Sequence, residues 1–259
     1  MSALQPPPVA LITAGTAGLG AATARCFAKA GIRVVVNYHS NEPRASDLVE
    51  ELKRLSTIPK GPEANDVIAS SEKADLSSKE DIRKLVENTM KVMGRLDIVF
   101  SNGGWTRLRD INDLEDNMDE EDWDRCFNMN VKQHLWLMHA AKPHLEATEG
   151  VFITTASLAG VKVSGSSLAY AVSKAAQIHL VQGLAMIASP KVRVNSVSPG
   201  LMLTEWGLQF GPERIEEMTN RTRLKRLATV EEVAEQVLCF ARSRSVTGVN
   251  AIIDGGLSL

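Results

Sequence analysis

Cysteine, aromatic residues and net charge are all scarce in this chain. Its 259 residues include three cysteines and 5% aromatic residues, and 29 basic side chains nearly balance 31 acidic ones. The balanced charge and the few aromatic residues argue against a surface that binds nucleic acid. Cys26, Cys126 and Cys239 lie far apart and show no metal-site spacing, so we expect buried thiols in a reducing compartment.

Long hydrophobic runs are missing as well. No apolar stretch approaches the ~18 to 20 residues that a membrane-spanning helix needs, and residues 1–8 are proline-rich without the regions of a signal peptide. We expect residues 1–8 to be a flexible tail and the protein to be cytoplasmic, without a membrane partner. Neither a repeat nor a linker divides the chain, so residues 1–259 are expected to form a single domain.

What the chain does contain is a series of short apolar runs with helical patterns between them. Continuous runs at residues 9–12, 34–36, 98–100, 151–153, 192–194 and 251–253 are typical of parallel strands covered on both faces. Helices are expected at residues 19–30, 122–145 and 168–188. The pattern predicts an α/β fold, a Rossmann-type doubly wound parallel sheet of about seven strands with helices on both faces.

Two polar segments fit this pattern less well. Residues 56–73 contain Pro59, Gly61 and Pro62 and indicate a third strand only weakly. Residues 110–124 are dense in Asp and Glu, and we interpret them as a solvated loop and helix start. The alternative, a metal site, lacks the spacing and the turn glycine of a calcium-binding loop.

A glycine-rich segment, Thr-Ala-Gly-Thr-Ala-Gly-Leu-Gly, joins the first strand to the first helix. Glycines there let the backbone approach a pyrophosphate, and the helix N-terminus offers free N–H groups. The segment fits TGxxxGxG except that Ala14 replaces the first glycine. We predict nucleotide binding rather than a mere tight turn, with contacts from Thr13, Gly15, Thr16, Gly18, Leu19 and Gly20.

The end of the second strand bears on the cofactor. A carboxylate there would bind the ribose 2′-hydroxyl of NAD and repel the 2′-phosphate of NADP. The chain instead has Asn37, Tyr38, His39 and Ser40, with Arg33 and Arg44 on either side. The missing acid favours NADPH/NADP+ over NAD(H), although these residues could also be ordinary polar turn residues.

Tyr170 and Lys174 lie one helical turn apart on the same face of the helix expected at residues 168–188. An ammonium beside a phenol favours the phenolate and makes its proton easier to donate or accept near neutral pH. Ser157 follows the strand at residues 151–153, where its hydroxyl could polarise a carbonyl oxygen. A YxxxK pattern alone is weak, but it is accompanied by further motifs.

Those motifs are TAGTAGLG, ADL at 74–76, SNGG at 101–104, Asn130, Ser157, YAVSK, SPG at 198–200 and DGG at 254–256. In this order and spacing the chain resembles the compact, single-domain branch of the short-chain dehydrogenase/reductase superfamily. Alanine at position 14, alanine at 17 and glycine at 103 depart from the family pattern. Ala17 stands where NADP-preferring members often carry a basic residue, which weakens the NADP prediction.

The resemblance implies roles for individual residues. Tyr170 would be the general acid or base, Lys174 would lower its pKa and bind the nicotinamide ribose, and Ser157 would orient the substrate oxygen. Asn130 would hold the water that links Lys174 to solvent. Further cofactor contacts are implied for Asp75, which would meet the adenine, and for Leu76, Asn102, Gly103, Gly104, Pro199, Gly200, Met202 and Thr204.

The predicted activity is hydride transfer between NADP(H) and the carbonyl or secondary alcohol of a bulky, mostly apolar small molecule. Arg107 and Arg109 could bind an anionic group on it, and Met202, Trp206 and Phe210 offer apolar surface. A non-redox isomerase or cyclase and a non-catalytic cofactor-binding sensor remain alternatives. The resemblance also implies a homo-oligomer, a dimer or a homotetramer.

Overall fold

The computed structural model describes residues 6–59 and 67–259, and a parallel seven-stranded sheet forms its centre. The strand order is β3-β2-β1-β4-β5-β6-β7, which confirms the predicted doubly wound α/β fold. The strands are β1 (Val9–Ile12), β2 (Arg33–Tyr38), β3 (Ala69–Lys73), β4 (Ile98–Ser101), β5 (Val151–Thr155), β6 (Arg193–Pro199) and β7 (Asn250–Ile253).

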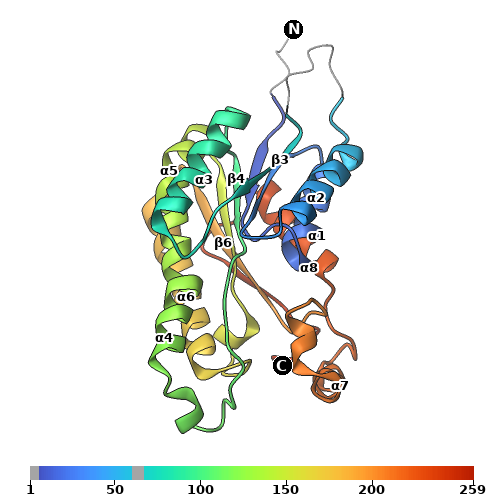
Figure 1. The fold of residues 1–259 in the computed structure, drawn as a ribbon, viewed down its shortest axis with the longest axis vertical. Coiled ribbons are helices and arrows are strands. Elements are labelled where there is room, and N and C mark those ends of the chain that lie inside the picture. The colour runs from blue at the N-terminus through green and yellow to red at the C-terminus, as the bar shows by residue number, and fades with distance from the viewer. Residues whose placement is uncertain (1–5, 60–66) are drawn as a thin grey trace.

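Helices cover both faces of this sheet (Figure 1). One face carries α1 (Gly18–Lys29), α2 (Glu42–Leu55) and α8 (Val230–Arg242), and the other carries α3 (Lys79–Met93), α5 (Gln133–Thr148) and α6 (Leu168–Ala188). Two shorter helices, α4 (Glu120–Phe127) and α7 (Pro212–Arg221), lie beyond the carboxyl ends of the strands. The short turns are η1 (Glu115–Asn117), η2 (Asn128–Lys132), η3 (Leu158–Gly160) and η4 (Gly207–Phe210).

The five inner strands each contribute to two hydrophobic cores, one under each helical layer. In β1, Ala10 and Ile12 pack with α1 and α8, whereas Val9 and Leu11 pack with α3 and α5. All four side chains are fully buried. Because neither face of the sheet meets water, the central strands are continuous apolar runs rather than alternating ones.

The third strand has little apolar character because it lies at the edge of the sheet. β3 has the sequence Ala-Ser-Ser-Glu-Lys and pairs with β2 alone, and only Ala69 is buried. An edge strand with polar and charged side chains is a common solution in natural sheets. Residues 60–66 of this segment, and residues 1–5 of the expected tail, lie outside the described part of the chain.

The prediction of one helix over residues 122–145 is wrong in its continuity. The structure has α4, then the π-helical turn η2, then α5. The π turn places Asn130 where its side chain reaches the loop after β4, a contact that a sequence pattern does not reveal. The prediction of three buried thiols is also wrong: Cys126 is buried and Cys26 half-buried, but Cys239 is exposed on the outer face of α8.

The direction in which successive strands are added to the sheet reverses at β1. β2 lies on one side of β1 and β4 on the other, so the loops after β1 and β4 diverge and leave a crevice at their carboxyl ends. Within the described residues, none of the helices combines the length and the apolar character that a membrane span requires.

Candidate active site

The turn after β1 is tied to the ends of both neighbouring strands. The buried Thr13 hydroxyl accepts hydrogen bonds from the backbone N–H groups of Asn102 (2.9 Å) and Gly103 (3.3 Å). On the other side, the Asn37 side chain accepts from the N–H of Ala14 at 3.1 Å. These hydrogen bonds hold the start of the glycine-rich segment against the ends of β2 and β4.

The glycines of this segment allow very close packing of the backbone. A Cβ on Gly20 would lie 2.3 Å from the carbonyl oxygen of Ala14, and one on Gly15 would lie 2.9 Å from that of Ile12. Gly18 has a φ of 47°, in the left-handed region. Ala17 caps α1 without any side-chain hydrogen bond, so the first N–H groups of the helix face the crevice without a side-chain acceptor. A pyrophosphate fits such a cradle.

A cavity of about 920 Å³ extends from this turn along the ends of β2, β3 and β4. Asn37 is buried, and its amide nitrogen donates to the carbonyl oxygens of Tyr38, Glu72 and Ala74, so this side chain serves mainly to join β2 to β3. The predicted residues that line the cavity are Thr16, Asn37, Tyr38, His39, Ser40, Asp75, Leu76, Gly103 and Gly104.

Arg33 is the first residue of β2 and Arg44 follows the strand, and of these two only Arg44 lines this cavity. Arg33 is buried in the sheet, where its guanidinium donates to the carbonyl oxygens of Val67 and Met93. At the cavity wall, hydrogen bonds from the Ser77 backbone and hydroxyl lower the pKa of Asp75, the first of these being the stronger cause.

A second cavity, of about 560 Å³, lies on the other side of the glycine-rich turn. Thr13, Gly15, Gly20 and Asn130 line neither cavity and support the walls instead. The predicted residues that line the second cavity are Gly18, Leu19, Asn102, Gly104, Ser157, Tyr170, Lys174, Pro199, Gly200, Met202 and Thr204.

Ser157, Tyr170 and Lys174 converge in this second cavity. Ser157 caps the turn η3, and its hydroxyl accepts from the N–H of Ala159 at 3.1 Å. Burial raises the pKa of Tyr170 to about 12, and a hydrogen bond with Ser157 acts in the opposite direction. Burial thus outweighs the hydrogen bond with Ser157, and a lowering of the Tyr170 pKa by Lys174 stays a prediction.

The Lys174 amine is held at the end of β5. It donates to the carbonyl oxygen of Thr155 at 2.8 Å and to the side-chain oxygen of Gln177 at 2.9 Å. Burial lowers the pKa of Lys174 to about 7, so near neutral pH the group is only partly charged. Gln177 was not among the sequence predictions, because its burial and its hydrogen bond with Lys174 are known only from the structure.

Asn130 has several partners in addition to any role toward Lys174. Its side chain accepts from the N–H of Trp105 at 2.8 Å and donates to the Trp105 carbonyl and to the Ser173 hydroxyl, both at 2.9 Å. It thereby joins the loop after β4 to α6. Binding of a water by Asn130 stays a prediction.

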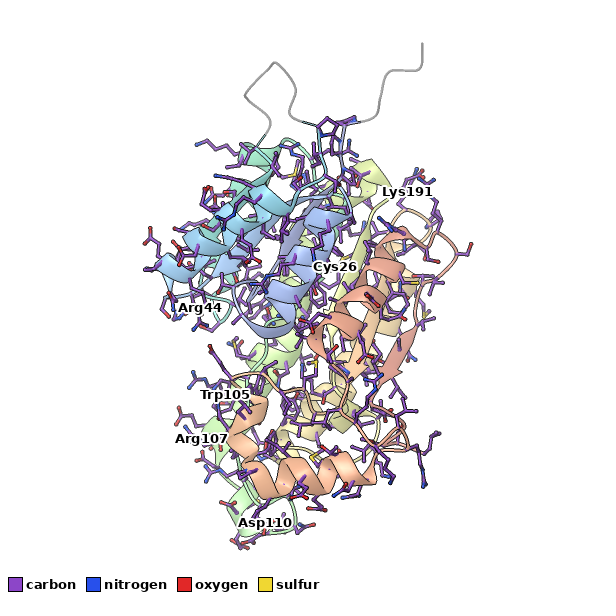
Figure 2. The ribbon with its side chains drawn as sticks, turned by 90° about the vertical axis from the view of Figure 1, so that its right-hand side faces the viewer. Cys26, Arg44, Trp105, Arg107, Asp110 and Lys191 are labelled. Carbon is purple, nitrogen blue, oxygen red and sulfur yellow. The ribbon has the colours of Figure 1, made fainter. Side chains whose placement is uncertain are left out.

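The sequence suggests that Arg107 and Arg109 could bind a substrate anion, and in this structure acidic side chains already occupy both guanidinium groups. Both pair with the acidic segment: Arg109 with Asp116, Asp119 and Asp122 at 2.8 to 3.3 Å, and Arg107 with Asp122 at 2.9 Å. Figure 2 shows Arg107 below Trp105 and Arg44 on one side of the molecule. The acids of residues 110–124 thus neutralise two arginines, and no group of three or more His, Cys, Asp or Glu among the described residues could hold a metal ion.

Comparison with known proteins agrees with this geometry. The family model described as enoyl-(acyl carrier protein) reductase matches residues 13–258. The chain belongs to the short-chain dehydrogenase/reductase superfamily. The superfamily binds nicotinamide cofactors, and similar proteins across nearly the whole chain are reductases and dehydrogenases, so the chain is an oxidoreductase.

Two relatives and two solved structures illustrate the similarity. Secoisolariciresinol dehydrogenase of Forsythia intermedia is 34% identical over 97% of this chain and 89% of its own length, and 3-oxoacyl-(acyl-carrier-protein) reductase of Thermotoga maritima is 31% identical over 96% and 97%. A short-chain dehydrogenase from Burkholderia cenocepacia in complex with NADP is 28% identical, with a TM-score of 0.85 over 97% of this chain and 98% of that one. A 7α-hydroxysteroid dehydrogenase with NADH and a 7-oxo bile acid is also 28% identical, with a TM-score of 0.83 over 96% and 93%.

The structure explains one departure from the superfamily pattern, at Gly103, and shows backbone strain at another, Ala14. A Cβ on Gly103 would lie 2.5 Å from Leu76 Cδ1 and 3.0 Å from Gln133 Nε2, so the usual alanine would not fit here without rearrangement. Ala14, which replaces a glycine, has a φ of 47°, a conformation that alanine adopts at some cost in strain.

The raised pKa of Tyr170 can be measured directly because the chain has only two tyrosines. In a Tyr38→Phe variant, phenolate absorbance reports Tyr170 alone. We expect less than about a tenth of the phenol to ionise at pH 10 in the folded protein, against about half in urea. Half ionisation in both states at that pH would contradict the burial of the phenol.

Proposed function

We propose that this short-chain dehydrogenase/reductase interconverts a ketone and a secondary alcohol with NADP(H), and that Tyr170 is the general acid and base. The observation that supports this most is the meeting of Ser157, Tyr170 and Lys174 in one cavity beside the glycine-rich turn. A nicotinamide cofactor bound at that turn supplies or accepts the hydride.

The chain's own residues handle the proton and the oxygen. The Tyr170 hydroxyl donates its proton to the carbonyl oxygen in reduction and takes it back in alcohol oxidation. The Ser157 hydroxyl donates a hydrogen bond to the same oxygen and stabilises the charge that develops on it. In its protonated form Lys174 favours the Tyr170 phenolate, and its pKa of about 7 lets it gain or lose a proton near neutral pH.

The cofactor preference is proposed from the end of β2. Residues 39–41, directly after this strand, include no carboxylate, and His39, Ser40 and Arg44 line the cavity there. A 2′-phosphate would meet a cation and hydrogen-bond donors at this place rather than a repelling acid. Similar solved structures include complexes with NADP and with NADH, so this proposal depends on the residues of the chain itself.

The substrate is proposed to be a bulky, mostly apolar and uncharged molecule. Trp206 lies edge-on to Tyr170 with 6.0 Å between ring centroids, and Phe210, Met202 and Met218 add apolar walls. Lys174 and Glu205 are the charged residues that line this cavity, and both have protein partners. A substrate carboxylate would therefore lose its hydration and meet the Glu205 carboxylate, while the Lys174 amine already donates to Thr155 and Gln177.

Cofactor preference should appear in a fluorescence titration. Trp105 and Trp206 line the second cavity, so energy transfer to a bound reduced nicotinamide should be strong. We expect the Kd for NADPH to be at least about tenfold lower than that for NADH, because the extra phosphate gains charge-assisted hydrogen bonds. Tighter binding of NADH would contradict the proposed preference.

The role of Tyr170 is tested with Tyr170→Phe, which removes the hydroxyl and keeps the ring. We expect turnover of a ketone substrate to fall by about 10²- to 10⁴-fold, because the general acid is lost, while the Kd for NADPH stays unchanged. Val172→Ala, on the exposed side of the same helix, is the control and should keep turnover. Near wild-type turnover by Tyr170→Phe would refute the mechanism.

Substrate charge is tested with pairs of bicyclic ketones, such as a tetralone and its carboxylated analogue. We expect kcat/KM to be at least about tenfold higher for the neutral member of each pair, since the cavity offers no unpaired cation for a carboxylate. Equal or better use of the carboxylated ketones would show that an arginine leaves its acidic partners to bind them.

A further inference from the structure

Arg44 connects two parts of the site that are far apart in sequence. It lies in the first turn of α2 and lines the first cavity, close to the end of β2. Its guanidinium pairs with Glu205, at 3.0 Å from one carboxylate oxygen and 3.4 Å from the other. Glu205 belongs to the loop after β6 and lines the second cavity.

The carboxylate of Glu205 occupies the two guanidinium nitrogens that a phosphate would use. Arginine binds carboxylates and phosphates alike through paired N–H donors, so one guanidinium cannot serve both fully at once. Both side chains are well exposed, 41% for Arg44 and 75% for Glu205. An exposed ion pair of this kind is weak and can be broken by a more highly charged anion.

We propose that Arg44 exchanges Glu205 for the 2′-phosphate of NADP(H), so that Glu205 is an internal competitor that limits the preference for the phosphorylated cofactor. This inference depends on the proposed use of NADP(H). NADH carries no phosphate at that position and leaves the ion pair in place. Arg44 and Glu205 thus set cofactor specificity in opposite directions.

The exchange also reaches the substrate cavity. Glu205 stands between Thr204, which lies against Gly18, and Trp206, which lies against Tyr170. Backbone bonds from Thr204 to Met202 and from Leu208 to Thr204 make residues 202–208 a compact turn. Release of Glu205 therefore removes a tie between this turn and α2 on the far side of the glycine-rich segment.

Binding of NADPH and NADH to four proteins tests the exchange: wild type, Glu205→Gln, Arg44→Gln and the double variant, at fixed ionic strength. We expect Glu205→Gln to lower the Kd for NADPH by about 2- to 5-fold, in keeping with a weak exposed pair, and to leave that for NADH unchanged. Arg44→Gln should raise the Kd for NADPH about tenfold or more and leave that for NADH unchanged. In the Arg44→Gln background, Glu205→Gln should lose its effect.

Two exposed residues serve as controls for net charge. Glu216→Gln on α7 and Arg54→Gln in the last turn of α2 change the charge equally and should leave both Kd values unchanged. Arg44→Lys, which keeps the charge but not the paired donors, should bind NADPH with a Kd between those of wild type and Arg44→Gln. Melting temperatures of all variants check that the fold is intact.

Amide hydrogen exchange of residues 202–208 tests whether the turn loosens when Glu205 is released. The ligands used are adenosine monophosphates, which have no nicotinamide ring that could protect these residues. We expect 2′-AMP to speed exchange there, as Glu205→Gln alone should, and 5′-AMP to have no such effect. Unchanged exchange with 2′-AMP would overturn the link to the substrate cavity.

The outcomes separate this inference from the proposed function. If Arg44→Gln weakens NADPH binding but Glu205→Gln leaves it unchanged, the competition is refuted and the use of NADP(H) stands. If Arg44→Gln leaves NADPH binding unchanged, Arg44 is not the phosphate ligand and the inference fails. If wild type binds NADH more tightly than NADPH, the cofactor proposal itself fails.

Discussion

The burial of the Lys174 amine is the constraint on which the rest of the site depends. A buried amine must find hydrogen-bond acceptors, and Lys174 finds them in the Thr155 carbonyl at the end of β5 and in Gln177. α6 must therefore press closely on the sheet. Gly160 lets the turn η3 pack directly against α6, because a Cβ there would lie 2.5 Å from the Lys174 backbone. The same contact holds the turn that carries Ser157 beside Tyr170.

The two arginines of the loop after β4 form ion pairs outside the second cavity. The acidic segment at residues 110–124 looks like a solvated loop in the sequence, yet three of its aspartates hold Arg109. Arg107 is held in the same way and also lies 5.7 Å from the Trp105 ring. Neither arginine lines the second cavity, whose walls combine apolar side chains with hydroxyl groups. If the proposed function is correct, shape and dehydration rather than charge attraction select the substrate.

Local sequence patterns were enough to predict most of the strands and helices and the residues at the centre of the site. Continuous apolar runs predicted the strands that are covered on both faces, and the helix Leu168–Ala188 has the predicted bounds. The π turn around Asn130, the acceptor Gln177 and the pair of Arg44 with Glu205 were missed. Each is fixed by contacts between segments distant in the chain or by a local backbone irregularity, and neither leaves a periodic trace in the sequence.

The two cavities share a wall, and this makes their chemistry interdependent. Ala14, Ala17, Gly104 and Trp105 line both, so a dinucleotide that fits the first cavity must pass this wall to bring its reactive ring to Tyr170. Small residues at three of the four positions keep the passage open. Among the described residues, the exposed pair of Arg44 with Glu205 is the only ion pair that joins α2 to the turn at residues 202–208. If Arg44 exchanges Glu205 for a cofactor phosphate as proposed, residues 202–208 lose this weak link without a change in the fold.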